Sequence, residues 1–353
     1  MNNTTYVTGH RHPDSDAICA AITYANLLRL QGVDAVALRQ GPVNEETKFI
    51  LKRFNQENPL LMTDARMKLH DIDMDRPAII RKNATVHHAW HVMLHAKNRS
   101  LFVVDEKNRL CGICTTSNLS KVRLHPAANQ AELMSHATLD DIAHTIGGRI
   151  VWGPDDFHTN GVVHIITLEG REATMFNLED GISILSSGSE KQKMLINEGA
   201  KCLVITCGLI VDDDVVQMAK SRGCAIVETS EDTMHTAQVI NESYSIEHIM
   251  TSDVITFSEE EFVDDVAAKI SKSRVRSYPV LDAEGRITGA VSLYHVRDYP
   301  HRKMVLVDHC ASNQSIKHVE LADIQEIVDH HHVGDITTDH PINYFGVRCG
   351  CTC

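Results

Sequence analysis

The sequence predicts an α/β protein in which a parallel-sheet domain is interrupted by other modules. A short apolar strand at 4–8 is followed by an amphipathic helix at 16–30 and a second apolar run at 35–38, which is the usual start of a parallel sheet. The same pattern returns near the C-terminus, where apolar runs at 304–307 and 326–328 lead directly into acids and histidines. Strands that alternate with helices favour the α/β class.

The composition limits the class of protein. A chain of 353 residues with 43% hydrophobic and 23% charged residues has room for two or three domains. It has no apolar run long enough to span a membrane and no signal-peptide pattern at its N-terminus, so we expect a cytoplasmic protein. Ten irregularly spaced cysteines indicate reduced thiols rather than a disulfide framework.

The charge indicates which partners to expect. A net charge of −13, from 47 acidic and 34 basic residues, disfavours nonspecific binding to nucleic acid or to an anionic membrane. Cations are more natural partners. An anionic substrate would need metal ions or a local basic patch to offset this negative charge.

An internal repeat lies between the two sheet-forming parts. Residues 100–119 align without a gap to 277–296, and the alignment pairs Gly112 with Gly289. Each copy follows an extended apolar segment and an amphipathic helix, so a strand–helix–strand–turn–strand–helix module is predicted twice. A third unit between the copies has apolar strands of its own.

The loops after the predicted sheet strands carry the chemistry. His10, Asp14 and Asp16 follow the first strand, and Asp308 and 329–331 follow the C-terminal strands. Because ligands of open parallel sheets bind beyond the carboxyl ends of the strands, we expect these loops to meet in one crevice. The aspartates have an alternative role as helix caps, but that explanation must be repeated at every strand end. Carboxylates mixed with imidazoles suit Mn²⁺, Co²⁺, Mg²⁺ or Zn²⁺.

Such a cluster has a use in phosphoryl transfer. Two ions about 3.5 to 4 Å apart can share a carboxylate, convert water to hydroxide and hold phosphoryl oxygens for in-line attack. No G-x-G-x-x-G follows the first strand, so a dinucleotide site is not favoured.

The segments GHRHPDSDAICAAITYA, VDHC and VDHHH resemble the DHH phosphoesterase superfamily, specifically the family II inorganic pyrophosphatases. The repeats resemble cystathionine-β-synthase (CBS) domains, and the unit between them is similar to a DRTGG domain. The resemblance implies a Rossmann-like parallel-sheet DHH domain interrupted by a CBS pair and a DRTGG-type α/β domain. The implied boundaries are 1–66 and 301–353 for the DHH domain, 67–122 and 245–300 for the CBS domains, and 130–243 for the DRTGG-like domain.

The resemblance also implies a reaction, the hydrolysis of inorganic pyrophosphate to two phosphates by a hydroxide that bridges two metal ions. Mn²⁺ or Co²⁺ would occupy the two-metal site, and Mg²⁺ would accompany the substrate. The implied ligands are His10, Asp14 and Asp308 for one ion, and Asp16, His330 and the shared Asp308 for the other. His331 would face the substrate or leaving group, and Asp329 would orient this motif.

The sequence departs from the family pattern at four loop positions. His12 and Cys310 replace asparagines, Ser15 replaces a threonine, and His332 replaces a common arginine. His12 and Cys310 are potential ligands themselves. The family continues beyond a segment like VRCGCTC with a further metal-binding aspartate and a second domain that clamps pyrophosphate, whereas the sequence given ends at Cys353. We therefore expect the C-terminal DHH-associated domain to be absent and this polypeptide alone to hydrolyse pyrophosphate poorly or not at all.

The CBS resemblance implies regulation by adenine nucleotides and a homodimer formed through these domains. AMP or ADP would inhibit, and ATP or diadenosine polyphosphates would activate. The candidate nucleotide-binding residues are Thr115, Ser292, Arg274, Arg276 and Tyr278. Neither copy keeps the family's aspartate three residues after the hydroxyl, since Asn118 and His295 stand there.

Two other functions remain open from the sequence. One is another DHH phosphoesterase, acting on polyphosphate, short oligonucleotides or cyclic dinucleotides. The other is a nucleotide-sensing module with a vestigial metal site, which would bind adenine nucleotides without releasing phosphate.

Overall fold

The computed structural model describes residues 4–96, 99–122, 127–167, 177–273 and 275–352. The chain forms two compact units, which are described separately. Unit 1 comprises Met1–Asp75, Thr256–Ala283 and Thr288–Cys353, and unit 2 comprises Arg76–Ile255 and Glu284–Ile287. In the described ranges, no helix is long and apolar enough to cross a membrane.

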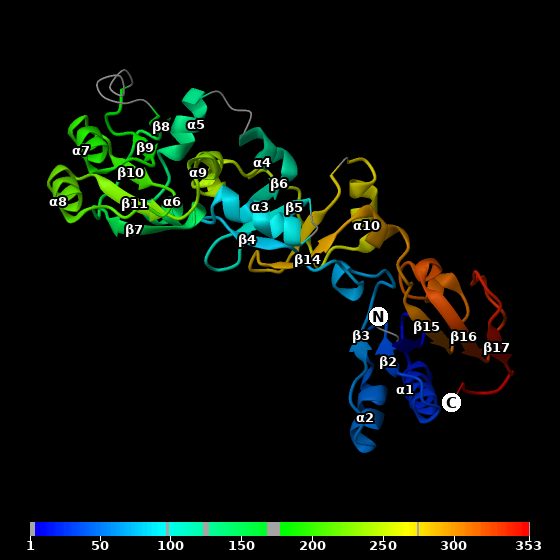
Figure 1. Cartoon of the computed structure of the whole chain (residues 1–353). Coiled ribbons are helices and arrows are strands. Elements are labelled where there is room, and N and C mark those ends of the chain that lie inside the picture. Colours follow the sequence, from blue (N-terminus) through cyan, green and yellow to red (C-terminus); the bar gives the residue numbers. More distant parts are fainter. Residues whose placement is uncertain (1–3, 97–98, 123–126, 168–176, 274, 353) are drawn as a thin grey trace. The chain divides into compact units, whose positions relative to one another are not determined.

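A six-stranded sheet forms the main part of unit 1. Its strands are β1 (Thr5–Thr8), β2 (Ala35–Arg39), β3 (Leu60–Leu61), β15 (Lys303–Val307), β16 (Asp323–Asp329) and β17 (Asn343–Gly346). They lie in the order β17-β16-β15-β1-β2-β3 and every neighbouring pair is parallel. The blue N-terminal strands therefore lie beside the orange and red C-terminal ones (Figure 1). The predicted α/β sheet built from both ends of the chain is confirmed.

The helix after β1 sets the shape of the strand-end loop. Helix α1 (Ser15–Leu30) begins where the Asp14 side chain accepts the Ala17 N–H, and it ends before Gly32, whose φ is +86°. Its small buried face, which includes Ala21 and Ala25, packs in one cluster with strand residues of β1 and β15. The remaining elements of this part are α2 (Glu45–Arg53) and the 3₁₀ turns Ser312–Gln314 and Val319–Leu321.

The second repeat copy also belongs largely to unit 1. It comprises β12 (Phe257–Ser258), α10 (Val263–Ile270), β13 (Tyr278–Leu281), β14 (Ile287–Val291) and α11 (Leu293–Arg297), with the 3₁₀ turn Leu69–Asp71. The strand order is β12-β13-β14. The extended apolar segment that precedes this copy, 253–257, pairs regularly with β13 only from Phe257 onward.

The first copy, in unit 2, repeats this module. Its elements are β4 (Ile79–Arg81), α3 (Val86–His95), β5 (Ser100–Val104), β6 (Leu110–Thr115) and α4 (Thr116–Val122), and its strand order is β4-β5-β6. The paired glycines share a packing role. A Cβ at Gly112 would lie 2.7 Å from the backbone carbonyl oxygen of Thr251, which excludes a side chain there. A Cβ at Gly289 would lie 2.8 Å from the terminal methyl of Met74, so a side chain there would displace Met74.

The third α/β part of unit 2 has a five-stranded sheet in the order β7-β11-β10-β9-β8. Its elements are α5 (Ala127–Met134), α6 (Leu139–Thr145), β7 (Gly148–Trp152), β8 (Val163–Ile165), β9 (Ile182–Leu185), α7 (Ser189–Asn197), β10 (Cys202–Ile205), α8 (Asp213–Arg222), β11 (Ala225–Thr229), α9 (Thr233–Val239) and the 3₁₀ turns Ile240–Glu242 and Ile246–His248. Only β7 runs antiparallel. Strands β9 and β10 are buried throughout, as expected for a parallel sheet covered on both faces.

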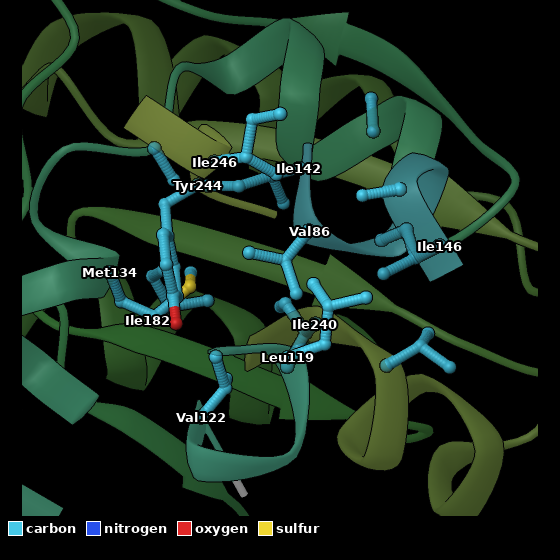
Figure 2. Packing of buried hydrophobic residues seen from close by; sticks show 14 of the residues in the cluster. Val86, Leu119, Val122, Met134, Ile142, Ile146, Ile182, Ile240, Tyr244 and Ile246 are labelled. Carbon is cyan, nitrogen blue, oxygen red and sulfur yellow. The ribbon is translucent and has the colours of Figure 1, made fainter. Parts of the chain in front are cut away.

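Tyr244 lies in the apolar core of unit 2, near Ile182 and Met134 (Figure 2). Its side chain is 1% exposed, and its hydroxyl has no hydrogen-bond partner among the described residues. We expect Tyr244→Phe to raise the free energy of unfolding by about 1 kcal/mol, because an unpaired polar group leaves the core. Tyr244→Ala should lower it by about 3–5 kcal/mol through the cavity it leaves. Urea unfolding checks both values, and a Phe variant less stable than the wild type would contradict the expectation.

Candidate metal centre

The loops that follow β1, β15, β16 and β17 meet beyond the carboxyl ends of the strands. They line a cavity of about 430 Å³. The predicted residues on its wall are His10, Asp14, Asp16, Asp308, His330 and His331, and the other lining residues are Arg11, His12, Asn313, Gln314 and Gly350. The sheet order places β15 next to β1, so residues nearly 300 positions apart become neighbours.

Asp308 lies at the centre of this crevice. It follows β15 directly, is 3% exposed and adopts a left-handed conformation with φ +60°, while its N–H donates to the carbonyl of Val328. One carboxylate oxygen lies 3.5 Å from His10 Nε2, and the other lies 3.1 Å from His330 Nε2. Left-handed backbone is uncommon for residues other than glycine and recurs at functional sites.

Two groups of potential metal ligands share Asp308. One is His10, Asp14 and Asp308, and the other is Asp308, His330 and His331; within each group the donor atoms lie within 4.8 Å of one another. In the described part of the chain, neither Asp14 nor Asp308 forms an ion pair with a lysine or arginine. Carboxylates brought together with imidazoles and without basic partners fit divalent cations such as Mn²⁺ and Co²⁺.

These carboxylates change the pKa values of His10 and His330. The hydrogen bond with Asp308 raises the pKa of His10 above its ordinary value, although burial opposes the shift. The hydrogen bond that His330 Nδ1 donates to the carbonyl of Cys349, together with the carboxylates of Asp308 and Asp16, raises the pKa of His330. In both cases the neighbouring carboxylates favour the protonated, positively charged form of the histidine ring.

The predicted ligand Asp16 lies at the same edge, with one carboxylate oxygen 3.8 Å from His330 Nε2. It also accepts hydrogen bonds from Cys351 Sγ, at 2.9 Å, and from the backbone N–H of Thr352, at 2.7 Å. Thr352 Oγ1 donates to Asp308 at 3.0 Å. Sequence reasoning missed these two residues. The signal in the sequence that could have identified Cys351 and Thr352 was their position after a further strand, β17, but this strand was not predicted.

His331 is held by the residue that ends β16. Its Nδ1 lies 2.8 Å from Asp329 Oδ1, which also accepts the His331 backbone N–H. Asp329 is 2% exposed. Burial tends to raise its pKa, but hydrogen bonds from Cys310 and His331 outweigh burial and lower it. A carboxylate bound to Nδ1 leaves Nε2 as the reactive nitrogen of His331.

Other residues of these loops have structural contacts. His309 is fully buried, with Nδ1 against the carbonyl of Val307 and Nε2 2.8 Å from Ser315 Oγ. Cys310 Sγ contacts the Gly334 N–H at 3.0 Å and the His332 carbonyl at 3.1 Å. Among the described residues, neither His12 nor Cys310 belongs to a ligand group.

The candidate nucleotide-binding residues are placed as follows. Thr115 Oγ1 bonds Asn118 Oδ1 at 2.5 Å, and Ser292 Oγ lies 2.9 Å from His295 Nδ1, so equivalent hydroxyls in the two copies contact the residue three positions later. Tyr278 is 1% exposed and packs against Phe257 in the core of the second copy, whereas Arg276 is exposed. Arg274 lies outside the described residues.

Comparisons with known proteins relate this site to metal-dependent enzymes. Residues 4–353 match the model of the DHH family, N-terminal domain. The chain is 29% identical over 355 aligned positions to a cobalt-dependent inorganic pyrophosphatase of Clostridium perfringens, and the match covers 100% of this chain. It is 25% identical over 351 positions to a probable manganese-dependent inorganic pyrophosphatase of Thermotoga maritima, with 98% of this chain covered. The chain spans 65% and 64% of the lengths of these two relatives.

A solved structure shows the fold of the interrupting modules. It holds the CBS and DRTGG domains of the regulatory region of Clostridium perfringens pyrophosphatase, complexed with the activator diadenosine tetraphosphate. The TM-score is 0.60 at 24% sequence identity, and the match covers 64% of this chain and all of that chain. The CBS/DRTGG-like fold expected from the sequence is thereby confirmed.

Proposed function

The chain belongs to the DHH family, and from that premise we propose that it carries the metal centre of a metal-dependent inorganic pyrophosphatase regulated by adenine nucleotides. The observation that carries the proposal is Asp308, which is shared by two mixed carboxylate–imidazole groups at the carboxyl ends of parallel strands. Two relatives that align with nearly the whole of this chain are named cobalt-dependent and probable manganese-dependent inorganic pyrophosphatases, which supports the proposed substrate.

The residues fit two divalent ions. His10, Asp14 and Asp308 would hold one, and Asp308, His330 and Asp16 would hold the other, each site being completed by further ligands. Held by these residues, two divalent ions would supply the activation of water and the neutralisation of phosphoryl oxygens that an in-line displacement needs.

The surrounding side chains prepare the crevice for an anion. Arg11 and His12 lie on its wall and also line an adjacent cavity with Lys317, which offers positive charge in a chain of net charge −13. His331, hydrogen-bonded to Asp329 through Nδ1, would protonate the leaving phosphate through Nε2.

Phosphate release from pyrophosphate tests the proposal. We would assay the 353-residue polypeptide with Mn²⁺, Co²⁺ or Mg²⁺, beside a version joined to the part of the Clostridium perfringens relative that it does not match. Activity dependent on metal, and higher in the joined protein, is expected. If neither protein releases phosphate and both still bind adenine nucleotides, the proposal is contradicted and a nucleotide sensor is favoured.

We further propose that Arg66 connects regulation to the metal centre's domain. Its guanidinium bonds Asp64 at 3.0 Å, and Asp64 in turn contacts His318 from the sheet domain. The central carbon of the Arg66 guanidinium lies 3.8 Å from the ring centroid of Phe262. Its Nη1 lies 3.4 Å from Asp265 on α10 of the second repeat copy. All five residues belong to unit 1. A nucleotide that moves α10 would therefore act on the sheet domain through this side chain.

Replacing Arg66 should weaken this coupling. In the joined protein carrying Arg66→Ala, we expect metal-dependent hydrolysis to persist. The response to diadenosine tetraphosphate or AMP should fall by roughly fivefold or more, which is the low end of ordinary coupling energies. Titration of activity against each nucleotide measures it. The control is Arg29→Ala, an exposed arginine in the last turn of α1. An unchanged nucleotide response in Arg66→Ala would contradict the connection.

A further inference from the structure

A row of histidines lies along helix α3 of the first repeat copy, in unit 2. The helix sequence VHHAWHVMLH carries four histidines, of which His87, His91 and His95 recur every four residues and therefore share one face. The rings of His87 and His91 meet edge to face with centroids 4.6 Å apart. None of these residues takes part in the crevice chemistry described above.

A buried carboxylate orients the first of them. Glu242, whose side chain is 4% exposed, lies with Oε2 3.0 Å from His87 Nδ1. Because a carboxylate oxygen accepts hydrogen bonds, this contact favours the tautomer of His87 that carries its proton on Nδ1. The lone pair of the neutral ring is then on Nε2, which is the nitrogen directed at His91.

The second ring presents the same atom. His91 Nε2 lies 3.1 Å from His87 Nε2. Two imidazole nitrogens bound to one tetrahedral ion at the usual bond length are about 3.3 Å apart. His95 Nδ1 donates to the backbone carbonyl of His91 at 2.7 Å, which extends the ordered row. The separation of the two Nε2 atoms is thus within a few tenths of an ångström of the distance that one shared ion requires.

We propose that His87 and His91 form a site for one divalent transition-metal ion, with Glu242 as the positioning residue. Imidazole nitrogen selects Zn²⁺, Co²⁺, Ni²⁺ or Cu²⁺ over Mg²⁺ and Ca²⁺. A histidine pair at i and i+4 is the spacing that helical zinc sites use. A carboxylate behind the ligating histidine is the usual outer partner that fixes its tautomer. Water completes the coordination at the exposed His91.

Metal binding by the full 353-residue chain tests the site. We would count Zn²⁺ and Ni²⁺ equivalents by competition with a chelating dye, in chains carrying Asp308→Asn so that the crevice contributes less. His87→Ala and His91→Ala should each lose one equivalent. The matched control is His88→Ala, which removes an exposed histidine of the same helix that the argument does not use. Glu242→Gln keeps the shape of the side chain and should weaken binding by roughly 10- to 100-fold.

A second readout excludes misfolding as the cause. Zn²⁺ should raise the melting temperature of unit 2 in the His88→Ala chain and leave it unchanged in the His91→Ala chain, while both chains melt alike without metal. Equal loss of metal in His88→Ala and His91→Ala would mean nonspecific uptake by a histidine-rich surface and would overturn the proposal. Retention of every equivalent in both His87→Ala and His91→Ala would mean that the rings only hydrogen-bond one another.

Discussion

Asp308→Asn is expected to remove metal from both ligand groups at once. Asp308 belongs to each of them, and its two carboxylate oxygens approach His10 and His330 separately. The amide keeps the volume of the side chain, but it lacks the charge and replaces one acceptor oxygen with a donor. Tightly bound Mn²⁺ should fall from two equivalents towards none, and metal-dependent hydrolysis by the joined protein should fall by more than about a hundredfold.

The control for this variant is Asp339→Asn, an exposed aspartate of the segment after His331 that belongs to neither ligand group. It should bind metal as the wild type does. Elemental analysis after gel filtration counts the ions, and calorimetry gives their affinities. Loss of a single equivalent in Asp308→Asn would show that the two groups do not share this carboxylate.

His331→Gln is expected to separate catalysis from metal binding. The structure brings His331 within reach of Asp308, with Nδ1 3.9 Å from Oδ1. Its Nδ1 is nevertheless held by Asp329 at 2.8 Å, which leaves Nε2 as the nitrogen that we propose acts on substrate. In the joined protein we expect both metal equivalents to remain and kcat for pyrophosphate to fall by about 10²- to 10⁴-fold, the usual contribution of a general acid.

The same measurement decides between two sets of ligands for the second ion. If His331→Gln loses one metal equivalent, His331 itself is a ligand and the role assigned to it from the sequence is wrong. Asp329→Asn provides the companion test. It replaces the acceptor that faces His331 Nδ1 and should slow the reaction in the same direction without removing metal.

Sequence patterns predicted much of the fold because local periodicity reflects local burial. The helix at 16–30 and the strands at 35–38 and 304–307 stand within one or two residues of their predicted ends. The short strands and the exposed strand were harder to predict from the sequence. Strands β3 and β12 have two residues each, which is too few for any periodicity to be visible. Strand β17 is exposed along its length, so burial leaves no pattern in its sequence.

The candidate site followed from residue types at strand ends, and the crevice brings together all the metal ligands named from the sequence. Residue type and position alone do not distinguish Asp308 from His309, two adjacent polar residues after the same strand, and only the family resemblance selected Asp308. Tertiary packing separates them. The left-handed backbone at Asp308 aims its carboxylate into the crevice, while His309 is buried against Val307 and Ser315.

By itself, the sequence determined the α/β class, the repeated module and the set of acids and histidines, because each depends on residue type and on spacing along the chain. Only the tertiary structure decided which of these side chains touch. The order β15-β1 brings Asp308 to His10, the unpredicted strand β17 delivers Thr352 to Asp308, and a buried Glu242 reaches His87 from 155 residues away. Such contacts depend on how distant segments pack, which local patterns in one sequence do not record.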